Sequence, residues 1–254
     1  MSNISNTLFM GKVLIQYKSL KSTNLEAQRL LAAGSLVEGT TIVASLQTEG
    51  KGQRGNTWHS PADSNLLSSC IVLPKFLLPR QQFMLNTITS LAMVDLLESL
   101  SISNVHIKWP NDIYIGKLKV AGMLIQNNIS AQAIQSSIIG IGLNVNQKKF
   151  DPKLPNPTSL KLHLGYDLDL ISVLKQLCYF LEKRYLQLKN DSNHTALLQQ
   201  YTERLYRLGK VATYLVEGKP VPGIIEGIDP IGKLVLRMDD GTRVFDFQEV
   251  KFLG

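Results

Sequence analysis

The sequence predicts an α+β fold: a mixed, largely antiparallel sheet with flanking helices, followed by a small C-terminal β-barrel. Strand-like and helix-like segments are intermingled without the regular βαβ alternation that builds a doubly wound sheet. From Gly209 onward, short β-like runs alternate with turns. The 254 residues suffice for one large domain plus a small one. We therefore expect two domains, 1–208 and 209–254, with the boundary near Leu208.

The elements of the first hundred residues are predicted from apolar patterning. Continuous or alternating apolar runs bounded by turn residues favour strands, whereas apolar residues at helical spacing favour helices. Strands are predicted at 12–17, 40–45 and 65–73, and helices between Ser22 and Gly34 and over 81–100. In the first helix, Thr23 and Glu26 have the spacing of a capping box, so we expect the helix N-terminus to be capped there.

The later elements are predicted in the same way, with turn residues separating them. Hairpin-turn chemistry at Gly116-Lys117 joins two of the strands. Strands are predicted at 105–109, 112–115, 118–127 and 136–145, helices at 169–188 and 193–207, and C-terminal β-like runs at 211–216, 221–228, 233–238 and 242–247. A connector rich in proline precedes the two helices.

Composition excludes several classes of protein. No apolar run approaches the roughly 20 residues that cross a bilayer, and the N-terminus lacks the features of a secretory signal. Cys70 and Cys178 both lie in apolar runs, so we expect buried free thiols and a cytoplasmic protein that does not bind membranes. The formal net charge of +7 invites a nucleic-acid hypothesis, but the cations are scattered and form no basic stripe.

The glycine-rich stretch Gly50–Gly55 satisfies the pattern G-x-G-x-x-G of dinucleotide-binding loops. Its context argues against that function, because Pro61 prevents a long helix and no acidic residue occurs between Asp63 and Asp95 to bind a ribose. The stretch remains a candidate anion-binding loop, and an ordinary surface loop is the alternative.

The segment Lys108–Asp112 (Lys-Trp-Pro-Asn-Asp) surrounds a predicted hairpin. If 118–127 is a regular strand, Lys119 and Gly122 lie on opposite faces of it, with Lys119 beside a site. A site and a surface Lys–Asp pair on a turn are equally good interpretations of this segment.

Two further patterns are compatible with a ligand pocket. Ser22-Thr23-Asn24 is explained by helix capping, although a helix N-terminus also offers unpaired N–H groups. Gly140, Gly142 and Asn144 alternate along a strand, which leaves a face without packing side chains, so something else lies against it. A pocket wall and packing against another backbone are the alternatives. The four histidines have no metal-ligand spacing.

Taken in order, these segments resemble the catalytic module of biotin–protein ligases. The resemblance covers about residues 10–254, including a C-terminal part similar to the family's SH3-like barrel. It is carried by Ser22-Thr23-Asn24, Gln47–Trp58, Ser60-Pro61, Asn65-Leu66, Lys108–Asp112, Lys119–Gly122 and Gly140–Asn144. It implies an enzyme that forms biotinyl-AMP from biotin and ATP and then transfers biotin to a lysine of a biotin carboxyl carrier domain.

The resemblance also implies roles for individual residues. Lys119 and Arg54 would be catalytic, and Asp112 would help to place Mg²⁺. Biotin would be bound by Ser22, Thr23, Asn24, Gln47, Gly50, Lys51, Lys119, Gly122, Gly140 and Gly142. ATP would be bound by Arg54, Trp58, Asn111, Lys119 and Asn144. The loop 50–61 would order over the adenylate and exclude water.

Two departures from the family pattern shape these expectations. Lys51, Gln53 and Asn56 stand where many members carry arginines, so the donors that hold the phosphate are left open. Only about 20 residues precede Ser22, too few for the N-terminal DNA-binding domain of some members, so we expect a monofunctional ligase that does not bind DNA. The rival functions are a lipoate–protein ligase or octanoyl transferase and, from another class, a non-enzymatic nucleic-acid-binding protein.

Overall fold

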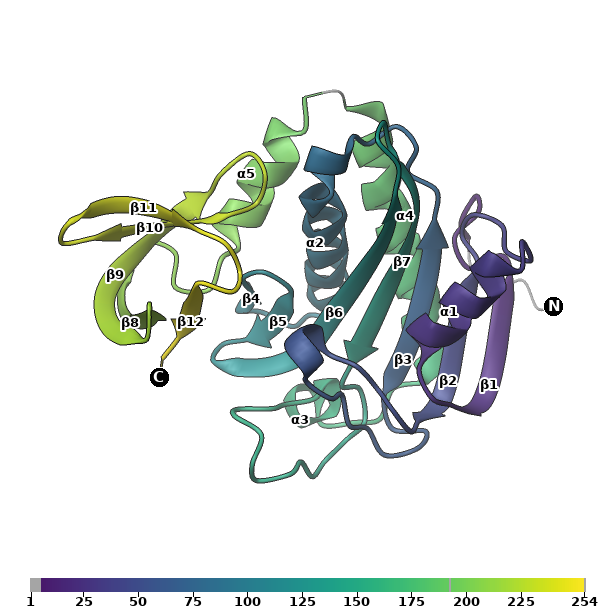
Figure 1. The fold of residues 1–254 in the computed structure, drawn as a ribbon. Coiled ribbons are helices and arrows are strands. Elements are labelled where there is room, and N and C mark those ends of the chain that lie inside the picture. The colour runs from purple at the N-terminus through teal and green to yellow at the C-terminus, as the bar shows by residue number, and fades with distance from the viewer. Residues whose placement is uncertain (1–5, 192, 254) are drawn as a thin grey trace.

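A computed structural model describes residues 6–191 and 193–253, with Arg54 described by its backbone only. Its centre is a seven-stranded sheet in the order β1-β2-β3-β7-β6-β5-β4 (Figure 1). The strands are β1 (Leu14–Leu20), β2 (Thr41–Gln47), β3 (Leu66–Val72), β4 (Val105–Lys108), β5 (Asp112–Ile115), β6 (Leu118–Ile129) and β7 (Ile134–Leu143). Only the β1–β2 pair is parallel, so the predicted mixed, largely antiparallel sheet is confirmed.

Helices cover both faces of this sheet. The long helices α2 (Phe83–Ser99) and α4 (Leu170–Asn190) pack on one face and share the main hydrophobic core with it, while α1 (Thr23–Ala32) packs on the other (Figure 1). Under α1, Ala27 joins Ile42, Ile71 and Ile138 in a second, smaller core. Every residue of β3 is therefore buried, which explains its continuous apolar character in the sequence.

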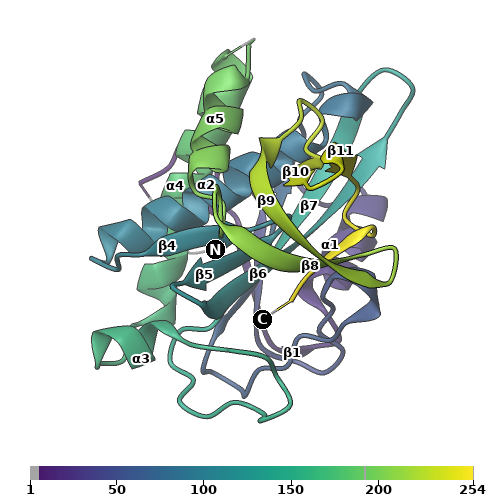
Figure 2. The ribbon, with the colours of Figure 1, turned by 90° about the vertical axis from the view of Figure 1, so that its left-hand side faces the viewer.

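The C-terminal strands form a separate five-stranded antiparallel sheet in the order β11-β10-β9-β8-β12. They are β8 (Val211–Val216), β9 (Lys219–Ile228), β10 (Leu234–Met238), β11 (Gly241–Phe245) and β12 (Val250–Phe252). This sheet lies beside β4–β6 and α5 (Thr195–Glu203), as Figure 2 shows. The division into domains at Leu208 stays a prediction.

The C-terminal sheet is held against the main body by specific contacts. The indole Nε1 of Trp109 donates to the carbonyl of Gly232 at 2.9 Å. Gly232 has a φ of 91° and lies directly on the ring of Phe83, so a side chain at this position would be strained and would collide. A Cβ-free, left-handed residue therefore lets the two parts approach each other.

Some elements were not predicted from the sequence because they are short. The helix α3 (Leu160–Leu164), the 3-10 turns at Gln53–Gly55 and Pro79–Gln81, and the strand β12 have too few residues to show a periodicity. Cys70 and Cys178 are buried free thiols, as predicted, and both contact the Thr41 hydroxyl. No helix in the described part of the chain is long and apolar enough to cross a bilayer.

Candidate active site

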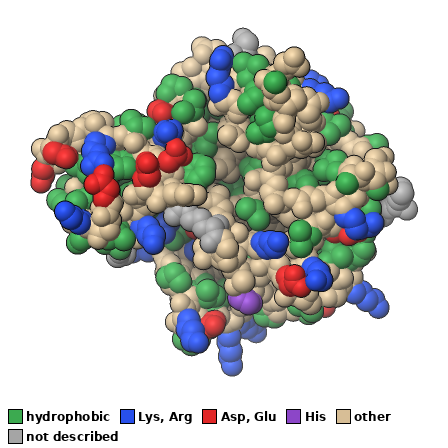
Figure 3. All heavy atoms as spheres, in the orientation of Figure 1, with side chains coloured by type: hydrophobic (Ala, Val, Ile, Leu, Met, Phe, Trp, Pro, Cys, Tyr) green, Lys and Arg blue, Asp and Glu red, His purple; other side chains and the backbone are tan. Residues whose placement is uncertain are grey.

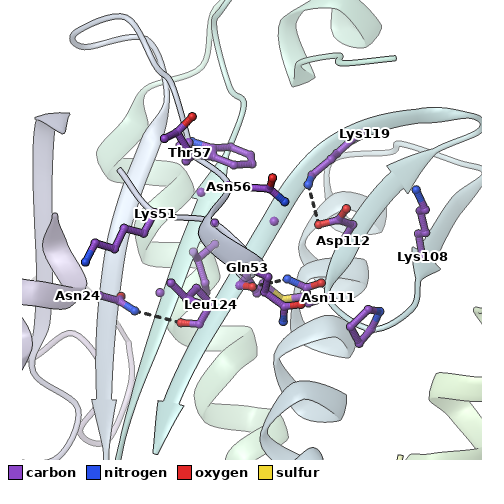
Figure 4. A pocket seen from close by; sticks show the side chains of 18 of the residues that line it. Asn24, Lys51, Gln53, Asn56, Thr57, Lys108, Asn111, Asp112, Lys119 and Leu124 are labelled. Carbon is purple, nitrogen blue, oxygen red and sulfur yellow. Dashed lines mark hydrogen bonds and ion pairs between the residues drawn. The ribbon is translucent and has the colours of Figure 1, made fainter. Parts of the chain in front are cut away.

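A cavity of about 320 Å³ lies on the α1 face of the main sheet. Its floor is formed by β3, β5, β6 and β7, one wall by α1 and the hairpin that contains Gly50–Trp58, and the opposite wall by the C-terminal sheet. Figure 3 shows the hollow between the C-terminal sheet and the main body, and Figure 4 shows the side chains that line it.

One end of the cavity is a network of neutral hydrogen-bonding groups. The backbone N–H and hydroxyl of Thr23 donate to Gln47 Oε1 at 2.7 and 3.0 Å. The Ser69 hydroxyl lies 2.7 Å from the Thr23 hydroxyl and 2.6 Å from Asn24 Oδ1. The predicted capping box is wrong: Ser22 is the N-cap without a side-chain bond, and the Glu26 carboxylate binds Tyr17 and Arg29 instead. Thr23 is thus free to bond across to β2.

The glycine face of β7 is filled by side chains from other elements, which confirms that something lies against it. Asn24 lies where a side chain of Gly140 would be, and a Cβ at Gly142 would come within 2.5 Å of the Trp58 ring. Asn24 Nδ2 donates to the carbonyl of Leu124 at 3.1 Å (Figure 4). Both glycines therefore provide clearance for polar or aromatic groups of the cavity.

The glycine-rich stretch forms a tight hairpin. Trp58 N donates to Gly50 O at 2.9 Å, Gly52 N donates to Asn56 O at 2.7 Å, and a 3-10 turn occupies the tip. No helix follows, so the argument against a dinucleotide-binding loop is confirmed. A side chain at Gly50 would collide with the Trp58 carbonyl, so this glycine permits the hairpin to close. The Arg54 side chain lies outside the described part of the chain.

The Trp58 ring lies inside the cavity, over the glycines of two strands. Besides Gly142, it contacts the position of Gly122, where a Cβ would lie 3.1 Å from the ring. Its Nε1 is buried and has no hydrogen-bond partner among the described residues. A buried N–H without a partner is costly in a folded protein, so this donor is well placed to bind a ligand.

A β-bulge turns Lys119 into the cavity. The β5–β6 register joins Ile113 to Ala121 and Tyr114 to Lys119, so Val120 is an extra residue in β6. Val120 and Ala121 are both fully buried, whereas Lys119 and Gly122 on either side of them line the cavity. The predicted placement of Lys119 and Gly122 on opposite faces is therefore wrong, because the extra residue brings both to the cavity.

Lys119 and Asp112 form an ion pair inside the cavity, with Nζ 2.7 Å from Oδ1 (Figure 4). Their side chains are 32% and 21% exposed, so the pair is partly shielded from water. Asn111 is anchored beside it, because its Nδ2 donates to Met123 O at 2.5 Å. The two interpretations of this segment therefore coincide: the Lys–Asp pair exists, and it is part of a cavity rather than of an open turn.

Lys108 is a second cation beside the Lys119–Asp112 pair, in the segment that the sequence singled out but without a role assigned to it. Its Nζ donates to the Tyr114 hydroxyl at 3.1 Å and lies 5.3 Å from the centre of the Phe252 ring. Burial lowers the pKa of this amine, and the nearby Asp112 carboxylate opposes the shift.

The C-terminal sheet contributes a wall that no sequence signal could have revealed. Phe247, Val250, Lys251 and Phe252 line the cavity although they lie more than a hundred residues from the sheet residues that they face. Only the docking of the two sheets brings them there. With Lys51, Lys108 and Lys119 they make the cavity rich in lysine, and Asp112 is the one carboxylate among its described lining residues. Such a site suits an anionic ligand.

The structure brings most of the predicted site residues together. The predicted residues that line the cavity are Ser22, Thr23, Asn24, Gln47, Lys51, Trp58, Asn111, Asp112, Lys119, Gly122, Gly140 and Gly142. Gly50 does not line the cavity, but it belongs to the hairpin, where it pairs with Trp58. Asn144 does not line it: its side chain is 5% exposed and Nδ2 donates to Thr158 O at 2.9 Å. The described residues contain no cluster of three potential metal-binding side chains.

Residues 17–144 match the model of the biotin/lipoate A/B protein ligase family. A biotin–[acetyl-CoA-carboxylase] ligase of Paracoccus denitrificans is 30% identical over 240 residues, which cover 92% of this chain and 98% of that protein. The bifunctional ligase/repressor BirA of Bacillus subtilis is 35% identical over 182 residues, 70% of this chain, and the match covers 55% of BirA. The chain thus spans about half the length of the Bacillus relatives that it matches.

Among solved structures, a biotin protein ligase from Aquifex aeolicus in complex with biotin and ATP superimposes with a TM-score of 0.80 at 26% identity. The superposition covers 95% of this chain and 99% of the Aquifex chain, so it includes both sheets. Together with the family match and the Paracoccus relative, it shows that the chain belongs to the biotin/lipoate A/B protein ligase family.

Proposed function

We propose that this protein is an ATP-dependent biotin–protein ligase. It would form biotinyl-AMP from biotin and ATP and then transfer biotin to a lysine of a biotin carboxyl carrier domain of a carboxylase. One observation carries the proposal: a single cavity joins a neutral hydrogen-bonding end to a lysine-rich end. Biotin has the matching asymmetry, with a neutral ureido ring at one end and a carboxylate at the other.

The neutral end is suited to the ureido ring. Thr23 and Gln47 line the cavity with a hydroxyl and an amide that can both donate and accept, and neither is charged. The fully buried Ser69 hydroxyl bonds to Thr23 behind them. Ser22 and Asn24 complete this end, while the lack of side chains at Gly122, Gly140 and Gly142 makes room for the Asn24 amide and the Trp58 ring that border the cavity. Lys51 and Gly50 belong to the hairpin that would close over the ligand.

The lysine-rich end is suited to adenylation. A biotin carboxylate oxygen attacks the α-phosphorus of ATP, the bond to the bridging oxygen breaks, and pyrophosphate leaves with its electron pair. Lys119 would stabilise the negative charge shared by the carboxylate and the α-phosphate, as an electrostatic catalyst that needs no protein nucleophile. Trp58, Asn111 and Arg54 would face the nucleotide, whereas Asn144, which the resemblance groups with them, does not line the cavity.

In the second step the acceptor lysine, as the free amine, attacks the carbonyl carbon of the mixed anhydride. An amide bond forms, AMP leaves, and the amine loses its proton. The hairpin at Gly50–Trp58 would keep water from the anhydride in the meantime. We also infer that the C-terminal sheet is the SH3-like unit of the family, placed so that its β12 edge borders the nucleotide.

Magnesium fits the side chains present. Mg²⁺ in nucleotide sites is commonly held by one or two carboxylates together with substrate phosphates, so a large protein cage is unnecessary. Asp112 provides a carboxylate in the cavity, already beside the lysine that would meet the phosphate. Bound there, the ion would screen the triphosphate, and Asp112 would be its protein ligand.

The rival functions predict different ligands. A lipoate ligase or octanoyl transferase of the same family would have to place a dithiolane or an alkyl end against Thr23 and Gln47, where neither end could hydrogen-bond to the polar groups that line the cavity. A nucleic-acid-binding protein would need a continuous basic surface, whereas the face in Figure 3 shows scattered cations and carries acidic side chains on the C-terminal sheet.

A biotin-dependent exchange of radioactive pyrophosphate into ATP tests the proposal directly. We expect exchange with biotin, ATP and Mg²⁺, and thermal stabilisation by biotin but not by lipoate or octanoate. Exchange that depends on lipoate instead of biotin would assign the rival ligase. No exchange with either acid, together with salt-dependent binding to nucleic acid, would favour the non-enzymatic function.

A further inference from the structure

Asn144 lies close to the catalytic lysine in the fold but outside the cavity lining. Lys119 is held through its backbone on the side opposite to β5: its N–H donates to Asn156 O at 2.8 Å, and its carbonyl accepts from Thr158 N at 2.9 Å. These residues belong to the proline-rich connector 146–159 between β7 and α3, which runs beneath the start of β6 in Figure 1.

The connector is in turn held by Asn144. Its side-chain Nδ2 donates to Thr158 O at 2.9 Å, and its backbone carbonyl accepts from Leu160 N at 3.0 Å. The backbone N–H of Asn144 donates to the carbonyl of Val120, the extra residue of the bulge, at 2.9 Å. Asn144 therefore touches the bulge on one side and the connector on the other, and both flank Lys119.

We propose that Asn144 is a positioning residue that clamps the connector onto the β6 bulge and thereby holds Lys119 in the cavity. This inference rests on the proposed function, because it assigns a role in the chemistry of Lys119. A bulge is an irregularity that strand pairing alone does not stabilise, since the extra residue leaves the ladder. The β6–β7 pairing begins at Ala121 and Leu143, so the connector takes the place of β7 beside Lys119, and the buried amide of Asn144 fixes the connector.

The matched control is two residues away. Asn146 also lies in the extension of β7 and also clamps a backbone, with Nδ2 donating to Leu168 O at 2.8 Å and Oδ1 accepting from Leu168 N at 2.9 Å. Leu168 lies beyond α3 and does not touch Lys119. Asn144→Asp and Asn146→Asp each remove one amide donor and add one negative charge with almost no change of shape. Asn146→Asp therefore controls for the charge and for the loss of a backbone clamp as such, and only Asn144→Asp releases the connector beside Lys119.

The test is a double-mutant cycle on single-turnover adenylation, with wild type, Asn144→Asp, Lys119→Ala and the double variant. If Asn144 acts through Lys119, Asn144→Asp lowers the rate 10- to 100-fold alone but less than about threefold in the Lys119→Ala background. Biotin affinity stays within about twofold, and Asn146→Asp leaves the rate within about twofold. An equal loss in both backgrounds, with a raised KM for ATP, would overturn the proposal in favour of direct nucleotide contact.

Amide hydrogen exchange supplies a readout that does not depend on activity. The clamp predicts faster exchange at Lys119 and Thr158 in Asn144→Asp and unchanged exchange there in Asn146→Asp. Unchanged exchange in both variants would overturn the clamp. A wild-type protein without biotin-dependent adenylation would refute the proposed function instead, and the exchange pattern would still decide the clamp.

Discussion

At the neutral end of the cavity, Thr23, Gln47 and Ser69 hold one another through their side chains, whereas at the charged end Lys119 is held through its backbone. The neutral network is made of groups that could themselves bind a ligand, so its order and its function depend on the same atoms. At the charged end the ordering bonds are separate from the ammonium group. Lys119 can therefore exchange Asp112 for a phosphate without losing its place in the fold.

The largest effect is expected at the charged end. Lys119→Ala should lower the adenylation rate about 10²- to 10³-fold, because one charge-stabilising group is removed from a preorganised site. The melting temperature should change little, since a partly exposed ion pair contributes weakly to stability. Lys117→Ala, at an exposed lysine in the preceding turn, is the control and should retain wild-type exchange. Wild-type exchange in Lys119→Ala would remove this lysine from the mechanism.

Substitutions at Gly140 and Gly142 of β7 should affect the neutral end and the charged end of the cavity separately. Gly140→Ala forces Asn24 out of its place and should raise the KM for biotin about tenfold, while Gly142→Ala pushes the Trp58 ring and should raise the KM for ATP more than that for biotin. Steady-state kinetics with each substrate varied would measure both, and each variant serves as the control of the other. The same change in both KM values for both variants would mean that the ends are not distinct.

Removal of one hydroxyl at the neutral end should weaken the binding of biotin. Thr23→Val breaks the side-chain bonds to Gln47 and Ser69, so the dissociation constant of biotin should rise about tenfold, or ~1.4 kcal/mol. Thr41→Val removes another buried hydroxyl far from the cavity and should leave biotin binding unchanged. Calorimetry on both variants would check this, and equal biotin affinity in Thr23→Val and wild type would contradict the assignment.

The smallest effect is expected behind the C-terminal wall. Tyr214 packs against Phe252, and its buried hydroxyl has no partner among the described residues. Tyr214→Phe should therefore leave both KM values within about twofold. Burial raises the pKa of Tyr214 to about 12, so the folded state binds this proton more tightly than the unfolded state does.

Because the pKa of Tyr214 is raised in the folded state, the stability of the protein depends on pH in the alkaline range. The contribution of the neutral phenol is fully present below pH 10 and is lost as the pH rises from about 10 to about 12. In Tyr214→Phe the free energy of unfolding should fall less steeply over this window, and urea melts at pH 8 and pH 11 would measure the difference. Parallel losses in the variant and the wild type would show that Tyr214 does not titrate with folding.

Local patterns were sufficient for much of this molecule. Apolar periodicity and turn residues predicted the order of the long elements. The strand face at Gly140 and Gly142, which has no side chains, indicated that other groups pack against that face. The spacing of Thr23 and Glu26 wrongly predicted a capping box, because a side chain caps a helix only if no better hydrogen-bond partner lies within its reach. Glu26 reaches Tyr17 and Arg29, and Thr23 reaches Gln47 on another strand.

By itself the sequence determined which segments are strands and helices, where glycines relieve crowding, and that the motifs follow one another in the order typical of a biotin–protein ligase. Only the tertiary structure decided that Lys119 faces the cavity, that Asn144 holds the connector beside it, and that Phe252 closes the opposite wall. The physical reason is that strand register and sheet docking are set by partners far away in the chain. One extra residue in a strand reverses every face that alternation predicts.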